Sequence, residues 1–188
     1  MNLANQLTFS RIILSFLCIG LTLKDTFISL IIAFFTFVVA SFTDYLDGFI
    51  ARRKNLISDL GKLLDPVADK ILVIGVFLTF LELGVINAWM VVVIMLREFV
   101  VTGIRFLGLN RGVVLEAKRF GKNKTFSQIL GIVIIYLILI LEKAHPQNYI
   151  VRILSRQFIP LLMWYIVGVT LFSGVYYLWA NRRLIKTF

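Results

Sequence analysis

An all-α integral membrane protein with six spanning helices is the fold that this sequence predicts. Hydrophobic residues make up 60% of the 188 residues and charged residues only 16%, whereas a soluble domain carries about a quarter charged residues. The apolar residues form long runs, and a run of about 20 is enough to span the hydrocarbon core of a bilayer. Lys and Arg flank these runs, as they do at the ends of membrane spans. These observations exclude a soluble globular domain.

The apolar runs give the candidate spans in order. They extend from about Leu7 to Leu23, Phe27 to Phe49, Leu60 to Leu83, Asn87 to Leu107, Phe120 to Leu141 and Phe158 to Trp179. Because the connections are short and no sequence repeat stands out, we expect one domain over residues 1–188. The first five residues carry no basic residue, and no small-residue cleavage pattern follows the first run. We therefore expect that run to be a retained helix and not a signal peptide.

The positions of Lys and Arg predict the orientation of the spans. The second-to-third connection, the fourth-to-fifth connection and the C-terminal tail carry 13 of these residues, and the opposite side carries four. The richer side is expected to face the cytoplasm, with both termini on it. Arg152 and Arg156 weaken this count, and an interfacial helix between His145 and Phe158 would explain them. The sequence therefore predicts a multi-pass protein of the cell (inner) membrane.

The net charge of +10 raises the question of a nucleic-acid partner. The cations lie between apolar runs and not on a separate polar domain, so we expect no nucleic acid. They suit anionic lipid headgroups and phosphorylated substrates instead. Cys18 is the single cysteine and His145 the single histidine. The sequence therefore offers neither an internal disulfide nor a Cys/His zinc site.

Four aspartates within 26 residues are the strongest chemical signal in the chain: Asp44, Asp47, Asp65 and Asp69. Spacings of three and four residues place each pair on one face of a helix. The short basic connection makes the second and third spans antiparallel neighbours, so the four carboxylates can converge near the cytoplasmic face. Clustered carboxylates near lipid are unfavourable without a cation. Oxygen ligands without His or Cys suit Mg²⁺, Mn²⁺ or Ca²⁺.

The aspartates have two other interpretations. They could satisfy one another and nearby Lys or Arg residues, or they could belong to a small divalent-metal transporter. A transport site favours acids near the bilayer midplane, whereas these lie at its edge. Gly48, Ala51 and Gly61 share the same helix faces and would admit a bulky ligand or a neighbouring helix. Arg52 could pair with a phosphate or with an aspartate.

The complete pattern D-x-x-D-G-x-x-A-R-x8-G-x-x-x-D-x-x-x-D, from Asp44 to Asp69, resembles the signature of the CDP-alcohol phosphotransferases. All eight defining positions match. The resemblance implies a six-helix membrane fold, usually a homodimer. It also implies that an alcohol displaces CMP from a CDP-linked lipid, here CDP-diacylglycerol, with Mg²⁺ or Mn²⁺ as the metal.

The resemblance further implies roles for individual residues. Asp44, Asp47 and Asp65 are the expected metal ligands, and Asp47 and Asp65 are the best candidates to bridge two ions. Asp69 is the expected general base, while a metal-ligand role or a shared role stays open. The CDP-diacylglycerol site is expected to include Asp44, Gly48, Ala51, Arg52 and Gly61.

Motifs outside the aspartate pattern indicate the acceptor. The segment from Arg97 to Arg105, and Gly121 to Gln128 at the start of the fifth span, resemble the bacterial branch of the family that forms phosphatidylglycerophosphate. The implied acceptor is sn-glycerol 3-phosphate, and the implied products are phosphatidylglycerophosphate and CMP. Within the same family, cardiolipin and phosphatidylinositol phosphate synthesis remain the alternatives.

The phosphate of this acceptor requires cations. The candidates are Arg97, Arg105, Lys122 and Lys124. Alternatively, Arg97 simply pairs with Glu98, with an aspartate or with backbone, and the two lysines are ordinary flanking residues. Thr8 and Arg11 are candidates to close the site from the first helix.

Overall fold

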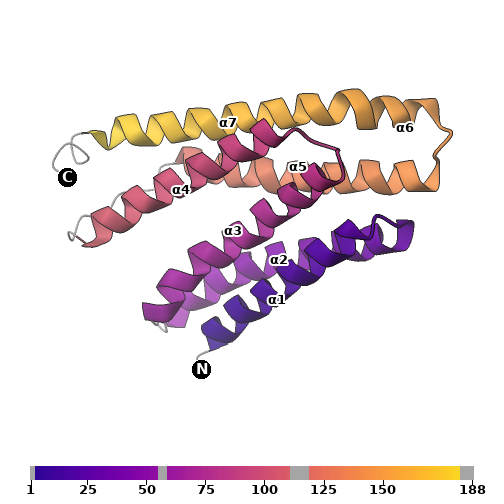
Figure 1. Ribbon diagram of the computed structural model, residues 1–188. Helices are drawn as coiled ribbons and strands as arrows, with labels where there is room; N and C mark the ends of the chain where they lie inside the picture. The colour runs from indigo at the N-terminus through magenta and orange to yellow at the C-terminus, as the bar shows by residue number, and fades with distance from the viewer. Residues whose placement is uncertain (1–2, 55–58, 111–118, 183–188) are drawn as a thin grey trace.

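The computed structural model describes residues 3–54, 59–110 and 119–182, with side chains for residues 8–43, 67–108 and 123–182. Every element in these ranges is helical, which confirms the predicted all-α class. The elements are α1 (Leu3–Leu23), α2 (Phe27–Lys54), α3 (Asp59–Glu82), α4 (Ala88–Asn110), α5 (Arg119–Ala144), α6 (Tyr149–Ile153), a π-helical turn η1 (Leu154–Phe158) and α7 (Ile159–Ala180) (Figure 1).

The long helices run antiparallel in chain order (Figure 1). The start of α1, the end of α2, the start of α3, the end of α4, the start of α5 and the end of α7 lie toward one end of the molecule, here called the terminal end. The α1–α2, α3–α4 and α5–α6 turns lie toward the other end, here called the turn end. Helix α1 packs on α2 and α3, α7 packs on α4 and α5, and α2 also contacts α5.

Local sequence signals produce the tight turns at the turn end. Gly84 adopts a φ of 69°, where a residue without a Cβ has no steric penalty. Its N–H donates to the Leu81 carbonyl, and the N–H of Val85 donates to the Phe80 carbonyl, both at 2.9 Å. This pair of bonds is the Schellman motif that ends a helix. The side chain of Asn148 accepts from the Ile150 N–H at 3.0 Å and caps the start of α6.

The outer surface of the helices is apolar. Large side chains such as Phe16, Phe35, Phe126 and Phe172 are each more than half exposed, a pattern that monomeric soluble proteins avoid. Among the described residues, 123–144 and 149–180 are long and apolar enough to cross a membrane, and 8–23 and 27–43 form shorter apolar helices. These helices are consistent with a membrane protein.

The last helix is longer than the sequence predicts. Helix α6, the turn η1 and α7 follow one another without interruption, and together they make a continuous helical stretch of 32 residues. Arg152 lies on α6 and Arg156 on η1, so both belong to a helix between His145 and Phe158, as expected. Pro160 follows the π turn and has no N–H to donate to a carbonyl one turn earlier.

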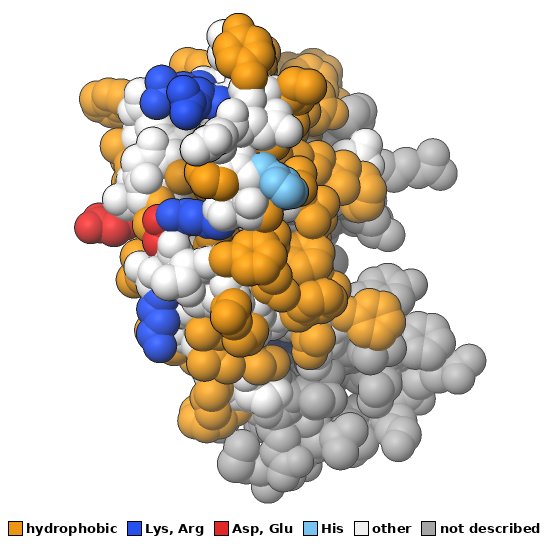
Figure 2. All heavy atoms as spheres, turned by 90° about the vertical axis from the view of Figure 1, so that its right-hand side faces the viewer, with side chains coloured by type: hydrophobic (Ala, Val, Ile, Leu, Met, Phe, Trp, Pro, Cys, Tyr) orange, Lys and Arg blue, Asp and Glu red, His pale blue; other side chains and the backbone are white. Residues whose placement is uncertain are grey.

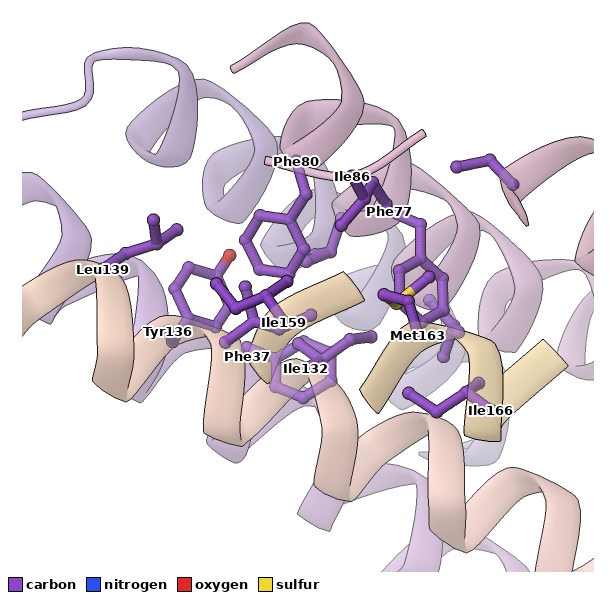
Figure 3. Packing of buried hydrophobic residues seen from close by; sticks show 14 of the residues in the cluster. Phe37, Phe77, Phe80, Ile86, Ile132, Tyr136, Leu139, Ile159, Met163 and Ile166 are labelled. Carbon is purple, nitrogen blue, oxygen red and sulfur yellow. The ribbon is translucent and has the colours of Figure 1, made fainter. Parts of the chain in front are cut away.

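A tight apolar core surrounds Tyr136 of α5 (Figure 3). Its ring packs edge-on against Phe80 at a centroid distance of 5.0 Å, and it also meets Phe37. The Tyr136 hydroxyl lies 2.7 Å from the Thr22 hydroxyl and 3.3 Å from the sulfur of Cys18. Cys18 is fully buried. These contacts join α1, α2, α3 and α5 through a single side chain.

The turn end carries few charged groups, and they are exposed (Figure 2). Lys143 and Asp25 form an ion pair there, and each side chain keeps more than a third of its surface exposed. The pale blue side chain in Figure 2 is His145, which lies on the surface. Among the described residues, the buried charged side chains are Arg11, Arg97, Glu98 and Lys124. They lie away from this end, in the part of the bundle that also contains Asp69.

Candidate active site

The backbone brings the helical segments of the aspartate pattern to the terminal end. Asp44 and Asp47 lie in the last three turns of α2, and Asp65 and Asp69 lie in the first three turns of α3. The two helices are in contact, and their ends lie side by side in Figure 1. Because these segments are helical, each pair of aspartates falls on one helix face. The side chains of Asp44, Asp47, Asp65, Gly48, Ala51, Arg52 and Gly61 lie outside the described residues.

Asp69 is the one aspartate of the four whose side chain is described. It is half-buried and interacts electrostatically with Lys70, the next residue of α3, and with Lys124 of α5. Among the described side chains, no group of three His, Cys, Asp or Glu residues could hold a metal ion. The expected metal site requires the three other aspartates, so this observation leaves it as a prediction.

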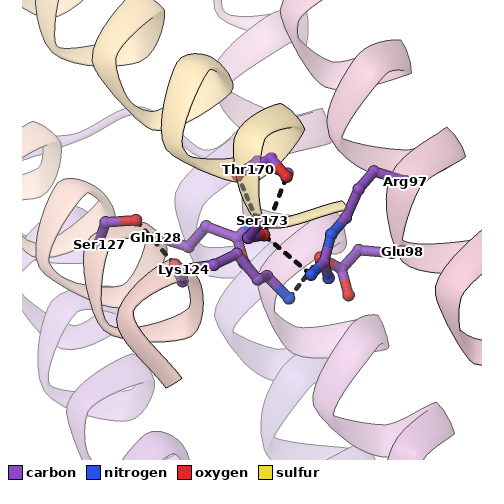
Figure 4. A network of polar contacts seen from close by, with 7 residues as sticks. All are labelled: Arg97, Glu98, Lys124, Ser127, Gln128, Thr170 and Ser173. Carbon is purple, nitrogen blue, oxygen red and sulfur yellow. Dashed lines mark hydrogen bonds and ion pairs between the residues drawn. The ribbon is translucent and has the colours of Figure 1, made fainter. Parts of the chain in front are cut away.

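Three charged side chains meet in the interior (Figure 4), and one of them, Lys124, interacts electrostatically with Asp69. Oε1 of Glu98 accepts from Nη1 of Arg97 at 3.2 Å and also contacts the ammonium group of Lys124. The exposed fractions of the three side chains are 9% for Arg97, 11% for Glu98 and 7% for Lys124. Buried charges persist only when they are paired. Lys124 is therefore a member of an internal ionic cluster and not an exposed flanking residue.

Helix α7 holds the guanidinium of Arg97 from the opposite side. Nη2 of Arg97 donates to the Ser173 hydroxyl at 2.9 Å, and that hydroxyl donates to the Thr170 carbonyl at 3.0 Å. The side-chain amide of Gln128 donates to the Thr170 hydroxyl at 3.3 Å and ties α5 into the same network. These contacts orient Arg97 within a helix that is mostly apolar.

Gly174 makes room for the Arg97 side chain. A Cβ at this position would lie 2.8 Å from Cγ and 3.4 Å from Nε of Arg97. The first distance is shorter than any ordinary carbon–carbon contact. The absence of a side chain at Gly174 therefore allows Arg97 to reach Ser173 and Glu98 together.

The other predicted cations are placed differently. Arg105 is exposed on α4, about 12 Å along the helix axis from Arg97, and it lies within electrostatic range of Lys70. The side chain of Lys122 lies outside the described residues. Thr8 and Arg11 are buried in α1, the helix that packs on α2 and α3.

Some residues of the cluster were not predicted as site residues. Glu98 was considered only as a partner for Arg97, whereas it also pairs with Lys124. Thr170, Ser173 and Gly174 were not considered at all. The available signal was a pair of hydroxyl residues three positions apart in an apolar span, because such side chains in a membrane helix commonly hydrogen-bond across to another helix.

A cavity of about 660 Å³ opens between α5 and α7 beside the cluster. Ser173, which holds Arg97, forms part of its wall, and so does Ser127, whose hydroxyl donates to the Lys124 carbonyl at 2.8 Å. The rest of its lining is mostly apolar: Phe126, Leu130, Gly131, Leu162, Tyr165, Gly168, Val169 and Phe172, with Asn123. A mostly apolar groove thus extends to Ser173 and Ser127, which contact the two cations of the cluster.

Comparison with known proteins identifies the class. The family model of the CDP-alcohol phosphatidyltransferases matches residues 1–172. The chain therefore belongs to the CDP-alcohol phosphatidyltransferase family, as the aspartate pattern predicts. This is a membrane-bound family whose members generally depend on a divalent metal.

Individual relatives are bacterial and share one printed function. The chain is similar to the CDP-diacylglycerol--glycerol-3-phosphate 3-phosphatidyltransferase of Bacillus subtilis, with 38% identity over 80% of this chain and 74% of the relative. It is similar to the protein of the same name from Rickettsia bellii, with 33% identity over 97% of this chain and 96% of the relative. It also resembles a probable phosphatidylglycerophosphate synthase of Mycobacterium tuberculosis, with 36% identity over 54% of this chain and 48% of the relative.

Proposed function

We propose that this protein transfers a phosphatidyl group from CDP-diacylglycerol to sn-glycerol 3-phosphate, forming phosphatidylglycerophosphate and releasing CMP. Relatives that match along most of their length carry this activity in their names. The observation that carries the proposal is the buried pair of cations Arg97 and Lys124, close to Asp69. An acceptor with its own phosphate needs such cations, whereas an acceptor without one does not.

This arrangement suggests which residues bind and activate the acceptor. Arg97 and Lys124 would bind the phosphate of glycerol 3-phosphate, with Arg105 and Lys122 near the water-facing entrance. Asp69, one helical turn after Asp65 in the sequence pattern, would accept the proton of the attacking hydroxyl. Asp69 interacts electrostatically with Lys70 and Lys124, so the proposed base lies within electrostatic range of the cations of the acceptor site. Thr8 and Arg11 would close the site from α1.

The donor end rests on the aspartate pattern. Asp44, Asp47 and Asp65, with Asp69 as a further candidate, would hold Mg²⁺ or Mn²⁺, and the oxygen-only donor set on adjacent helix ends fits such an ion. The metal, when bound, neutralises the diphosphate and stabilises charge on the departing CMP. Gly48, Ala51, Arg52 and Gly61 would line the cytidine diphosphate site. The groove between α5 and α7, beside the buried ionic cluster, offers an apolar surface for a lipid substrate.

We further propose the cellular setting that the sequence predicts. Six helical spans, with both termini in the cytoplasm, would place the terminal end and its polar site at the cytoplasmic face of the inner membrane. Water-soluble glycerol 3-phosphate reaches that face directly, while CDP-diacylglycerol arrives from within the lipid. The chain would act as one domain and as a homodimer.

The activity is tested by acceptor-dependent release of CMP. The purified protein in detergent is given CDP-diacylglycerol, Mg²⁺ or Mn²⁺, and one of four acceptors: glycerol 3-phosphate, inositol 1-phosphate, phosphatidylglycerol or serine. We expect release with glycerol 3-phosphate alone, and its loss in Asp69→Asn but not in the matched variant Asp25→Asn at the turn end. Release with a different acceptor alone would contradict the proposed acceptor, and no release with any acceptor would contradict the proposed reaction.

A further inference from the structure

We propose that Glu98 is a positioning residue that holds Arg97 and Lys124 together as a receptor for the acceptor's phosphate. The inference rests on the proposed function and adds a residue to it. Glu98 has no direct part in binding an anion, because a carboxylate repels a phosphate. Its contribution acts through the two cations that it contacts.

The need for such a residue comes from the geometry of the cluster. Arg97 belongs to α4 and Lys124 to α5, and both side chains are more than nine-tenths buried. Two buried like charges repel each other strongly in a medium of low dielectric. A single oxygen, Oε1 of Glu98, contacts both cations, and its negative charge offsets the repulsion between them. The cations therefore stay close to each other before any substrate arrives.

The cluster keeps its capacity for an anion despite this carboxylate. Lys70, Arg97 and Lys124 outnumber Glu98 and Asp69, and electrostatic interactions link all five. Arg97 carries five N–H donors and Lys124 three. Glu98 and Ser173 occupy two of the Arg97 donors through the contacts described above. Within the described part of the chain, Nε of Arg97 has no hydrogen-bond partner.

Other contacts also hold the helices around the cluster in place, so a change at Glu98 should mainly alter the positions of the two cations. Arg97 is bonded to Ser173 on α7, and the backbone of Lys124 accepts from Ser127. Preorganisation of this kind improves binding because less ordering is required when the ligand arrives. Loss of the carboxylate would leave the helices in place and let the two cations separate.

The test measures the Michaelis constants (KM) for the acceptor and for the donor separately in each variant. In Glu98→Gln, we expect the KM for glycerol 3-phosphate to rise at least tenfold, while the KM for CDP-diacylglycerol changes less than twofold. Glu98→Asp keeps the charge on a shorter side chain and should restore part of the loss. Glu82→Gln, at the turn end of α3, is the matched control and should leave both constants unchanged. A purely structural role would change both constants or the amount of folded protein instead.

A double-mutant cycle makes the mechanism specific. If Glu98 acts through Lys124, the double variant Glu98→Gln/Lys124→Gln should have an acceptor KM less than threefold above that of Lys124→Gln alone. The reason is that the single variant has already broken the Glu98–Lys124 pair. If the double variant raises the acceptor KM by the product of the two single fold-changes, the positioning role is overturned. An unchanged acceptor KM in Glu98→Gln would overturn it too. If Glu98→Gln does not fold, the same comparison is made with Glu98→Asp. Wild-type protein that releases no CMP with glycerol 3-phosphate would instead overturn the proposed function itself, and the inference with it.

Discussion

Adding one methyl group at Gly174 should weaken acceptor binding although Gly174 contacts no substrate in the proposed site. In Gly174→Ala, the new Cβ would lie 2.8 Å from Cγ of Arg97, so the arginine must move. Arg97 would then lose its bond of 2.9 Å to Ser173. Hydrogen bonds to charged groups contribute about 1.5–3 kcal/mol, and each 1.4 kcal/mol is a factor of ten in affinity. We expect the acceptor KM to rise about 10- to 100-fold.

The assay is CMP release at saturating CDP-diacylglycerol over a range of glycerol 3-phosphate concentrations. Gly168→Ala is the matched control, because the same helix gains the same methyl group and a Cβ there meets nothing within 4 Å. Thermal unfolding in detergent checks that both variants are folded. An acceptor KM in Gly174→Ala equal to that of Gly168→Ala would refute the argument that Arg97 is held in place for phosphate binding.

Three further predictions concern the apolar core, the turn end and the metal. Tyr136→Phe removes the hydroxyl that meets Thr22 and Cys18 and should lower the free energy of unfolding by about 1 kcal/mol, measured by thermal melting, with both KM values unchanged. Lys143→Gln breaks a pair that is more than a third exposed, so its effect on the same melting curve should stay below about 1 kcal/mol; a larger loss would mean that the pair is structurally important. EDTA should abolish CMP release, and added Mg²⁺ or Mn²⁺ should restore it. Activity that persists after chelation would contradict the proposed metal requirement.

Much of the fold could be predicted because lipid imposes simple rules on sequence. Runs of apolar residues located the long helices, and the predicted span from Phe27 to Phe49 begins at the same residue as α2. The helix ends were less predictable, because helices continue past the apolar core on polar residues. The predicted span from Phe158 lies within a helical stretch that already begins at Tyr149, since the polar residues before it satisfy helical geometry equally well.

The site was predictable only where spacing along one helix determines position. The pattern from Asp44 to Asp69 depends on such spacing, and the family match agrees with it. The partners of Arg97 on α7 depend instead on how distant segments pack. Ser173 lies 76 residues from Arg97, and nothing local to either residue indicates that they meet. For Lys124, only packing could distinguish a buried ionic role from a flanking one.

The continuous helix from Tyr149 to Ala180 also relates the site to the thickness of the host bilayer. Its 32 residues correspond to about 48 Å, whereas the hydrocarbon core measures about 30 Å. The excess of about 18 Å is close to the combined length of α6 and η1, and a helix that extends beyond the core only at this end would have Arg156 among the headgroups of one leaflet. Ser173, 17 residues further along, would then lie about 25 Å beyond Arg156 and about 12 Å inside the opposite boundary of the hydrocarbon core. If the proposed site binds glycerol 3-phosphate at the cytoplasmic face, a helix placed in this way would hold Arg97 further from the aqueous phase in a thicker membrane, and we expect acceptor access to depend on acyl-chain length in the host membrane.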